Sequence, residues 1–280
     1  MEKIFKFSKT EQLVVQFVML AWTLVVLLPF GTAVINSFKK SVGPVLRDPF
    51  GWPDPFVFSN YLKAWEGANF SAYFANSAII SLSSVVIVFF AASSTSFVLA
   101  RMPFKGSKVV FFCFLLGIMI PIRLALGPLF VIVRELGLLD SLLGIILVQS
   151  ASMMPMSVFI LTSFLKNISP ELEEAAKIDG ATPFRIYWSV VLPLVKPALA
   201  TIGLLTFVMA WNEYFLPLIF LQSPENYPLT IGITAFRTQF AVQWHMMFAG
   251  LLIMMVPTIV AFLLASKQFI HGLTQGGVKE

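Results

Sequence analysis

The segment Ser169–Pro193, SPELEEAAKIDGATPFRIYWSVVLP, is a polar stretch in a chain that is otherwise mostly apolar. Ser169-Pro170 is a typical helix start, since serine caps the first turn and proline fits its first position. The acidic residues that follow suit the positive end of the helix dipole, and they are Glu171, Glu173 and Glu174. Gly180 is a typical helix end, and Thr182-Pro183 repeats the cap and proline. We therefore predict two short helices joined by a defined turn.

The composition is that of a membrane protein. Of 280 residues, 58% are hydrophobic and 12% are charged, and the mean hydropathy is +0.87. A hydrocarbon core about 30 Å thick needs about 20 apolar residues per helix, and about six runs qualify. The runs are Leu13 to Ile35, Phe74 to Ala100, Val109 to Val133, Leu142 to Leu165, Leu194 to Leu221 and Met246 to Phe269. We predict an all-α membrane protein with six transmembrane helices in a single domain, residues 1–280.

The positions of Lys and Arg beside these runs predict the orientation, because cytoplasmic segments of membrane proteins are enriched in both. With a cytoplasmic N-terminus, the cytoplasmic side carries the larger set, nearer to the helix ends. Both termini and the segment Ser169–Pro193 are then cytoplasmic. The pI of about 9.4 reflects these dispersed cations, and binding of nucleic acid is not predicted.

Several chemical signatures are missing from the sequence. It has no G-x-x-x-x-G-K-[ST] loop for nucleotide phosphates, so we expect no ATP hydrolysis and no other catalysis in this chain. His245 and His271 have no acidic or cysteine cluster at ligand spacing, and no metal or cofactor is predicted. Cys113 is the only cysteine, which excludes an intrachain disulfide, and we expect a buried, unreactive thiol.

Four polar residues within the apolar runs are candidates for a solute pathway. Gln149 and Ser152 lie near a proline of the fourth run, and Asn212 and Glu213 lie in the fifth. Such groups are costly in a membrane unless they face a cavity, a protein partner or the interface. We predict a translocation pathway at these residues, with pairing or interfacial placement as the alternative.

The chain also resembles a known family. Glu174-Ala175-Ala176, three further residues, Gly180, nine further residues and Val190-x-Leu192-Pro193 resemble the Glu-Ala-Ala loop of permease subunits in ABC importers. Val190 departs from the isoleucine that the family often has, which is a small apolar change. The resemblance extends over nearly the full length and is strongest to the carbohydrate branch, especially the maltose-type inner-membrane permease. The segments that carry it are Asn76-Ser77, Ala100-Arg101, Phe104-Lys105-Gly106, Leu136-Gly137-Leu138 with Asp140, Ala210-Trp211-Asn212-Glu213, and the tail Gly272 to Lys279.

This resemblance implies a type I ABC importer permease fold with a cytoplasmic coupling helix, in a loop of about residues 166–193. The residues that it implies for ATPase coupling are Glu174, Ala175, Ala176, Asp179, Gly180, Leu192 and Pro193. The Gly-rich cytoplasmic tail, about residues 270–280, is flexible by composition. The resemblance implies that Gly276 and Gly277 in this tail contact the ATPase.

The implied partners are a second homologous permease subunit, two cytoplasmic ATPase subunits that bind ATP and Mg, and an extracellular or periplasmic solute-binding protein. The expected function is ATP-driven import of a carbohydrate, such as an oligosaccharide, by alternating access across the cytoplasmic (inner) membrane of a bacterium or archaeon. Two alternatives remain at this point. One is a secondary carrier or channel that works without an ATPase, and the other is a membrane scaffold that moves nothing.

Overall fold

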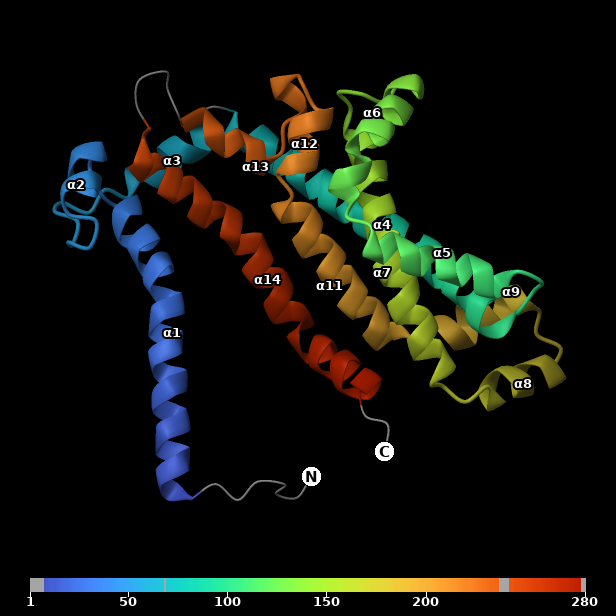
Figure 1. Ribbon diagram of the computed structural model, residues 1–280. Coiled ribbons are helices and arrows are strands. Elements are labelled where there is room, and N and C mark those ends of the chain that lie inside the picture. The colour runs from blue at the N-terminus through green and yellow to red at the C-terminus, as the bar shows by residue number, and fades with distance from the viewer. Residues whose placement is uncertain (1–7, 68, 237–241, 278–280) are drawn as a thin grey trace. The chain divides into compact units, whose positions relative to one another are not determined.

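Residues 8–67, 69–236 and 242–277 are described by a computed structural model (Figure 1). Side chains are described up to residue 266. Every regular element in these ranges is a helix, which confirms the predicted all-α class. Contacts divide the chain into two compact units. The first unit is Met1–Phe70 with Ile233–Met254, and the second is Ser71–Gly232 with Met255–Glu280. A single domain over the whole chain stays a prediction.

The first unit contains α1 (Lys9–Ser37), α2 (Val42–Arg47), α3 (Ser59–Glu66), η4 (Ile233–Phe236) and the start of α14 (Trp244–Gly277). Ser8 and Glu11 form a capping box that fixes the start of α1. At the other end of α1, the buried amide of Asn60 donates hydrogen bonds to the carbonyls of Ser37 and Lys39, at 2.7 and 2.9 Å. Asn60 therefore fastens α3 to the end of α1.

The second unit carries the remaining helices. They are α4 (Phe70–Arg101), α5 (Ser107–Met119), η1 (Ile122–Ala125), α6 (Leu126–Glu135), α7 (Leu142–Lys166), α8 (Glu171–Ile178), α9 (Pro183–Ile186), η2 (Tyr187–Val191), α10 (Leu192–Leu194), α11 (Lys196–Asn212), α12 (Phe215–Phe220), η3 (Pro224–Asn226) and α13 (Leu229–Gly232). A core of buried apolar side chains joins α4, α7 and α11 with the segment from α9 to α10. Ser93 shares a hydrogen bond with the hydroxyl of Tyr187, and Ser96 donates to the carbonyl of Val158. Small residues on α4 thus allow the close packing that holds helices together in lipid.

In the part of the chain that the structure describes, four helices are long and apolar enough to cross a membrane: Lys9–Ser37, Phe70–Arg101, Leu142–Lys166 and Trp244–Ser266. Two bent pairs raise the number to six if each pair is one span. Ser107–Met119 and Ile122–Glu135 meet at 96°, and Pro183–Leu194 and Lys196–Asn212 meet at 76°. The six predicted runs are therefore all present as helix. The third run is broken at its bend, whereas the second bend lies at the start of the fifth run, between Leu194 and Lys196.

Prolines account for the break in the third run and for a further break in the fifth run, at Glu213, which lies beyond the bend between Leu194 and Lys196. Pro121 disfavours helical geometry at the preceding residue, and Ile120 is extended there, with φ −90° and ψ 114°. In the fifth run, Pro217 has no N–H to give to the carbonyl of Glu213, and its ring would clash with that carbonyl in a helix. The chain becomes extended at Glu213, whose carbonyl accepts a hydrogen bond from the hydroxyl of Thr230 at 2.8 Å instead.

Two further expectations were wrong. Cys113 is exposed rather than buried, because no residue of α5 is buried and its neighbour α7 covers only part of it. The helix α14 continues through Gly272 and Gly276 to Gly277, although the composition predicts irregular chain there. A long helix propagates at little cost, and each glycine opposes it by only about 1 kcal/mol. Residues 278–280 lie outside the described residues.

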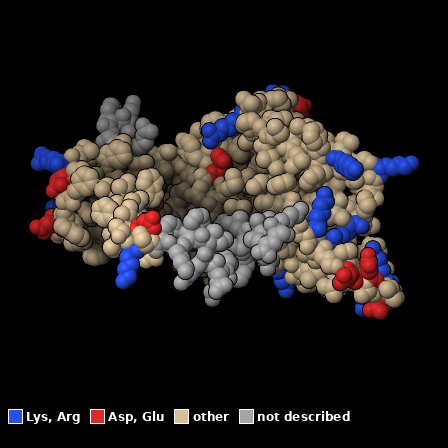
Figure 2. Space-filling model, turned by 60° about the horizontal axis from the view of Figure 1, so that its bottom comes forward, with Lys and Arg blue, Asp and Glu red and all other residues tan. Residues whose placement is uncertain are grey.

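The surface agrees with a membrane environment. On the face that Figure 2 shows, charged side chains are sparse, and broad areas carry neither acidic nor basic residues. Many large apolar side chains of the helices long enough to span are exposed, such as Phe17, Trp22 and Leu264. In water such a surface would drive aggregation, whereas in a bilayer it contacts lipid tails or protein partners.

Candidate functional site

The helix α8 forms for the local reasons that the sequence suggests, but it begins one residue later. It runs from Glu171 to Ile178, with Pro170 as its cap residue. The hydroxyl of Ser169 accepts a hydrogen bond from the backbone N–H of Glu171, at 3.4 Å. The three glutamates lie in the first turn, where the helix dipole favours negative charge.

The turn after α8 is a Schellman motif. The N–H of Ala181 donates to the carbonyl of Ala176 at 2.9 Å, and the N–H of Gly180 donates to that of Lys177 at 3.0 Å. Gly180 has φ +78°, which side-chain-bearing residues rarely adopt. Thr182 then caps α9 by accepting from the N–H of Arg185. The predicted turn and the predicted cap of α9 are confirmed, whereas α8 has Pro170 in place of Ser169 as its cap residue and no side-chain cap.

The two sides of α8 differ in what they contact. Glu173 is buried, and Ala176 packs against the core of the second unit. Glu174, Ala175, Asp179 and Gly180 are exposed. Leu172, Ile178 and Phe184 are large exposed apolar side chains of the same segment, and Ile178 is 86% exposed. An apolar surface beside an acidic helix is typical of a protein interaction site.

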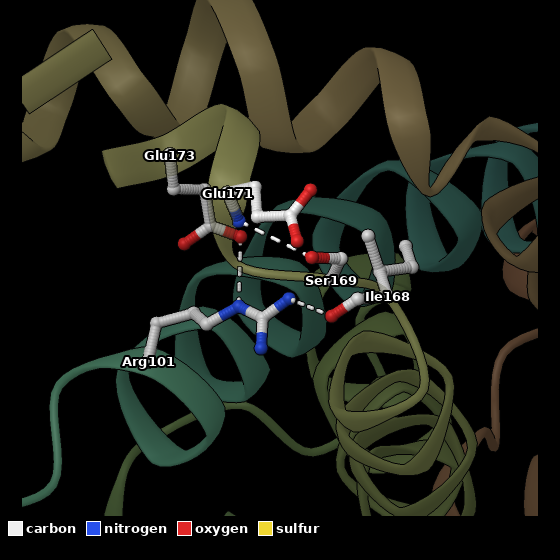
Figure 3. Close-up of polar contacts among 5 residues, drawn as sticks. All are labelled: Arg101, Ile168, Ser169, Glu171 and Glu173. Atoms are coloured by element: carbon white, nitrogen blue, oxygen red, sulfur yellow. Dashed lines mark hydrogen bonds and ion pairs between the residues drawn. The ribbon is translucent and has the colours of Figure 1, made fainter. Parts of the chain in front are cut away.

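Arg101, the last residue of α4, fastens the inner side of α8. Its Nε atom lies 2.7 Å from Oε1 of Glu173, and its Nη2 donates to the carbonyl of Ile168 at 2.8 Å (Figure 3). The side chains of Arg101 and Glu173 are only 12% and 4% exposed. The sequence alone does not predict this pair, because no spacing rule pairs residues 72 positions apart.

The last two predicted coupling residues, Leu192 and Pro193, follow α9 and differ in burial. Leu192 is buried in the core, whereas Pro193 is exposed. The N–H of Leu192 donates to the carbonyl of Tyr187 in a π-helical turn, η2. Such turns are frequent at functional sites. Leu192 therefore joins this segment to the core that α4, α7 and α11 share.

A cavity of about 800 Å³ lies within the second unit, a volume typical of small-molecule sites. Residues of α5, η1, α6, α7, α11 and α12 line it, with Glu213 between the last two. Most of the lining is apolar, and its polar side chains are Ser152, Ser157, Thr206 and Glu213. Two of the predicted pathway residues, Ser152 and Glu213, thus face the same space.

The other two predicted pathway residues do not line this cavity. Gln149 is buried, and its amide nitrogen and oxygen have no hydrogen-bond partner in the described structure. Asn212 is exposed and donates to the carbonyl of Val208 in its own helix, at 2.8 Å. The pathway role of all four residues stays a prediction.

Glu213 has a structural task besides facing the cavity. Its Oε1 accepts hydrogen bonds from the backbone N–H groups of Phe215 and Leu216, at 2.7 and 3.1 Å. These groups begin α12 and have no partner within that helix. Arg123, a charged residue of the third apolar run, is exposed, and its guanidinium lies 5.1 Å from the centre of the Phe215 ring.

Comparison with known proteins identifies the family. The family described as "Binding-protein-dependent transport system inner membrane component" matches residues 89–267. The diacetylchitobiose uptake system permease protein of Streptomyces coelicolor is 31% identical over 92% of this chain and 86% of its own. The arabinooligosaccharides transport system permease protein of Bacillus subtilis is 33% identical over 94% of this chain and 93% of its own.

A solved structure has the same fold. It is a bacterial ABC transporter involved in the import of the acidic polysaccharide alginate, and one of its chains superposes with a TM-score of 0.83 at 25% identity. The match covers 94% of this chain and 99% of that one. The chain belongs to the family of binding-protein-dependent transport system inner membrane components.

Proposed function

We propose that the chain is one permease subunit of an ATP-driven ABC importer that carries an oligosaccharide into the cytoplasm. Its relatives named above serve uptake of diacetylchitobiose and arabinooligosaccharides, and a further relative from Bacillus subtilis is a melibiose/raffinose/stachyose import permease. The assembly has a second permease subunit, an external solute-binding protein and two ATPase subunits that bind ATP and Mg. This chain itself needs no cofactor.

The observation that carries the proposal is that one side of α8 packs against the second unit while the other side is exposed. The exposed side presents Glu174, Ala175 and Ile178 to a partner. On the other side, Glu173 pairs with Arg101 and Ala176 packs against the core of the second unit. A surface of this kind suits an ATPase that pushes the helix when it closes. The displacement of α8 then reaches α4, α7 and α11 through the core against which Ala176 packs.

The cavity supports a choice of substrate charge. Among the described residues that line it, Glu213 is the one ionisable side chain. A carboxylate in a medium of low dielectric repels other carboxylates strongly, so an acidic sugar would be disfavoured there. Hydroxyl groups of a neutral sugar can instead donate to the carboxylate. We therefore propose a neutral oligosaccharide, unlike the alginate of the structural relative.

Uptake measurements test this function. Deleting the gene should abolish uptake of one class of radiolabelled neutral oligosaccharide, and a plasmid copy should restore it. In proteoliposomes, uptake should require the ATPase subunit, ATP and the binding protein. Uptake that persists without the ATPase would instead identify a carrier or channel. Competition by oligosaccharides of uronic acids as strong as that by neutral ones would contradict the choice of charge.

A further inference from the structure

Three elements meet at the guanidinium of Arg101. It is the last residue of α4, Ile168 follows the end of α7, and Glu173 lies in the first turn of α8 (Figure 3). The Arg101 side chain contacts the carbonyl of Ile168 and the carboxylate of Glu173 at hydrogen-bond distance, from two different nitrogen atoms. The planar guanidinium of arginine has donors in fixed directions and can bind two fixed partners at once. The ammonium of lysine is a compact charge without this geometry.

The burial of this pair sets it apart. Two ion pairs occur among the described residues, and the other, Arg134–Glu135, is largely exposed. Charges removed from water are retained only when well paired, and each then holds its partner strongly. The three glutamates of α8 are therefore not equivalent, because Glu173 turns inward to Arg101 while Glu171 and Glu174 are exposed.

From this geometry we infer that Arg101 and Glu173 are positioning residues, which make α8 move together with the end of α4. This inference rests on the proposed function, in which a partner ATPase pushes α8. Glu174 meets the partner, and Glu173 passes the displacement to a helix that crosses the membrane. Without the pair, the ATPase still docks and hydrolyses ATP, but less of each displacement reaches the membrane helices.

The test uses the whole importer in proteoliposomes, with the second permease, the ATPase and the binding protein present. The quantity measured is the sugar transported per ATP hydrolysed, together with the amount of ATPase that co-purifies. Glu173→Gln should lower sugar per ATP by about tenfold, within the usual range of coupling between sites, with the ATPase still bound. Glu171→Gln is the matched control, since it makes the same change at an exposed glutamate in the same turn, and it should leave the ratio unchanged.

A double variant guards against misfolding. Arg101→Met with Glu173→Leu removes both charges, so neither is left buried without a partner, and the fold should be retained. It should show the same loss of sugar per ATP as Glu173→Gln. A wild-type value of sugar per ATP in either variant overturns the inference. If uptake and ATP hydrolysis fall in parallel, or if both variants lose the fold, the pair is purely structural and the inference is also overturned. Absence of ATP-dependent uptake in the unaltered importer would instead overturn the proposed function.

Discussion

Asp140 and Ser223 are joined by two hydrogen bonds across 83 residues of sequence. The backbone N–H of Ser223 donates to Oδ1 of Asp140 at 2.9 Å, and its hydroxyl donates to Oδ2. The N–H of Gln222 donates to Oδ1 as well, and Asn226 donates to the carbonyl of Asp140. This one carboxylate therefore ties the connection between α6 and α7 to the chain that follows α12.

The first prediction concerns the pH dependence of this link. The hydroxyl of Ser223, with the N–H groups of Ser223 and Gln222, holds the pKa of Asp140 well below its usual range. A lowered folded-state pKa stabilises the fold above the unfolded value of about 4, and the stabilisation is lost as pH falls through the folded-state pKa. Asp140→Asn should cost about 1 kcal/mol at pH 7, a fall in Tm of about 2–4 °C.

Thermal unfolding of the solubilised chain measures this effect. The difference between the wild type and Asp140→Asn should shrink as pH falls below about 4. Glu135→Gln, which alters an exposed carboxylate in the helix just before this connection, is the control and should change Tm little. An Asp140→Asn difference that is independent of pH would show that the charge of Asp140 does not stabilise the link.

The second prediction concerns the turn after α8. Gly180→Pro removes the N–H that bonds to Lys177 and forbids the positive φ, so α8 should lose its orientation and the ATPase should co-purify poorly. Membrane insertion should be normal. Gly137→Pro is the matched control, because Gly137 also has a positive φ, +68°, and donates its N–H to the carbonyl of Arg134, but lies outside the coupling loop. ATPase association at the wild-type level in Gly180→Pro would refute the role of the turn.

The third prediction concerns the exposed side of α8. Ile178→Ser should weaken binding of the ATPase by about tenfold or more if Ile178 is an anchor of the interface, since buried apolar anchors carry most of the binding energy. Stability of the isolated chain should not change, because Ile178 is 86% exposed. Leu136→Ser, at an exposed leucine that follows α6, should leave ATPase binding unchanged. Equal binding by wild type and Ile178→Ser would exclude this residue from the interface.

The fourth prediction concerns the contact between α5 and α7. A Cβ atom at Gly117 would lie 2.9 Å from Cγ of Pro155, whereas one at Gly203 would lie 3.8 Å from its nearest neighbour, Val85. Gly117→Ala should therefore destabilise the chain by about 1–3 kcal/mol through overpacking, and Gly203→Ala should be tolerated. Thermal unfolding of both variants checks this. If Gly117→Ala is as stable as Gly203→Ala, the helices do not meet as closely as described.

Local chemistry explains which features the sequence could predict. The cap at Thr182 and the positive φ of Gly180 depend on neighbours within a few residues, so patterns of sequence indicate them. The break at Glu213 also has a local cause, Pro217. It is not predicted, because Pro217 lies within an apolar run long enough to be a single helix. The partners of Arg101 and Asp140 lie 72 and 83 residues away. Only the folded chain brings such pairs together, and one sequence carries no periodicity that reports them.

The last prediction separates the two tasks of Glu213. Its Oε1 caps the start of α12 by accepting hydrogen bonds from the backbone N–H groups of Phe215 and Leu216. Its side chain also faces the cavity. Glu213→Gln keeps an oxygen for the first task and removes the charge, whereas Glu213→Ala removes both. We expect Glu213→Gln to change Tm little, and Glu213→Ala to cost about 1–2 kcal/mol. If the carboxylate binds sugar hydroxyls, Glu213→Gln should raise the half-saturating sugar concentration about tenfold, as loss of a charged hydrogen bond does. Normal uptake in Glu213→Gln, with reduced stability in Glu213→Ala, would leave Glu213 as a helix cap alone.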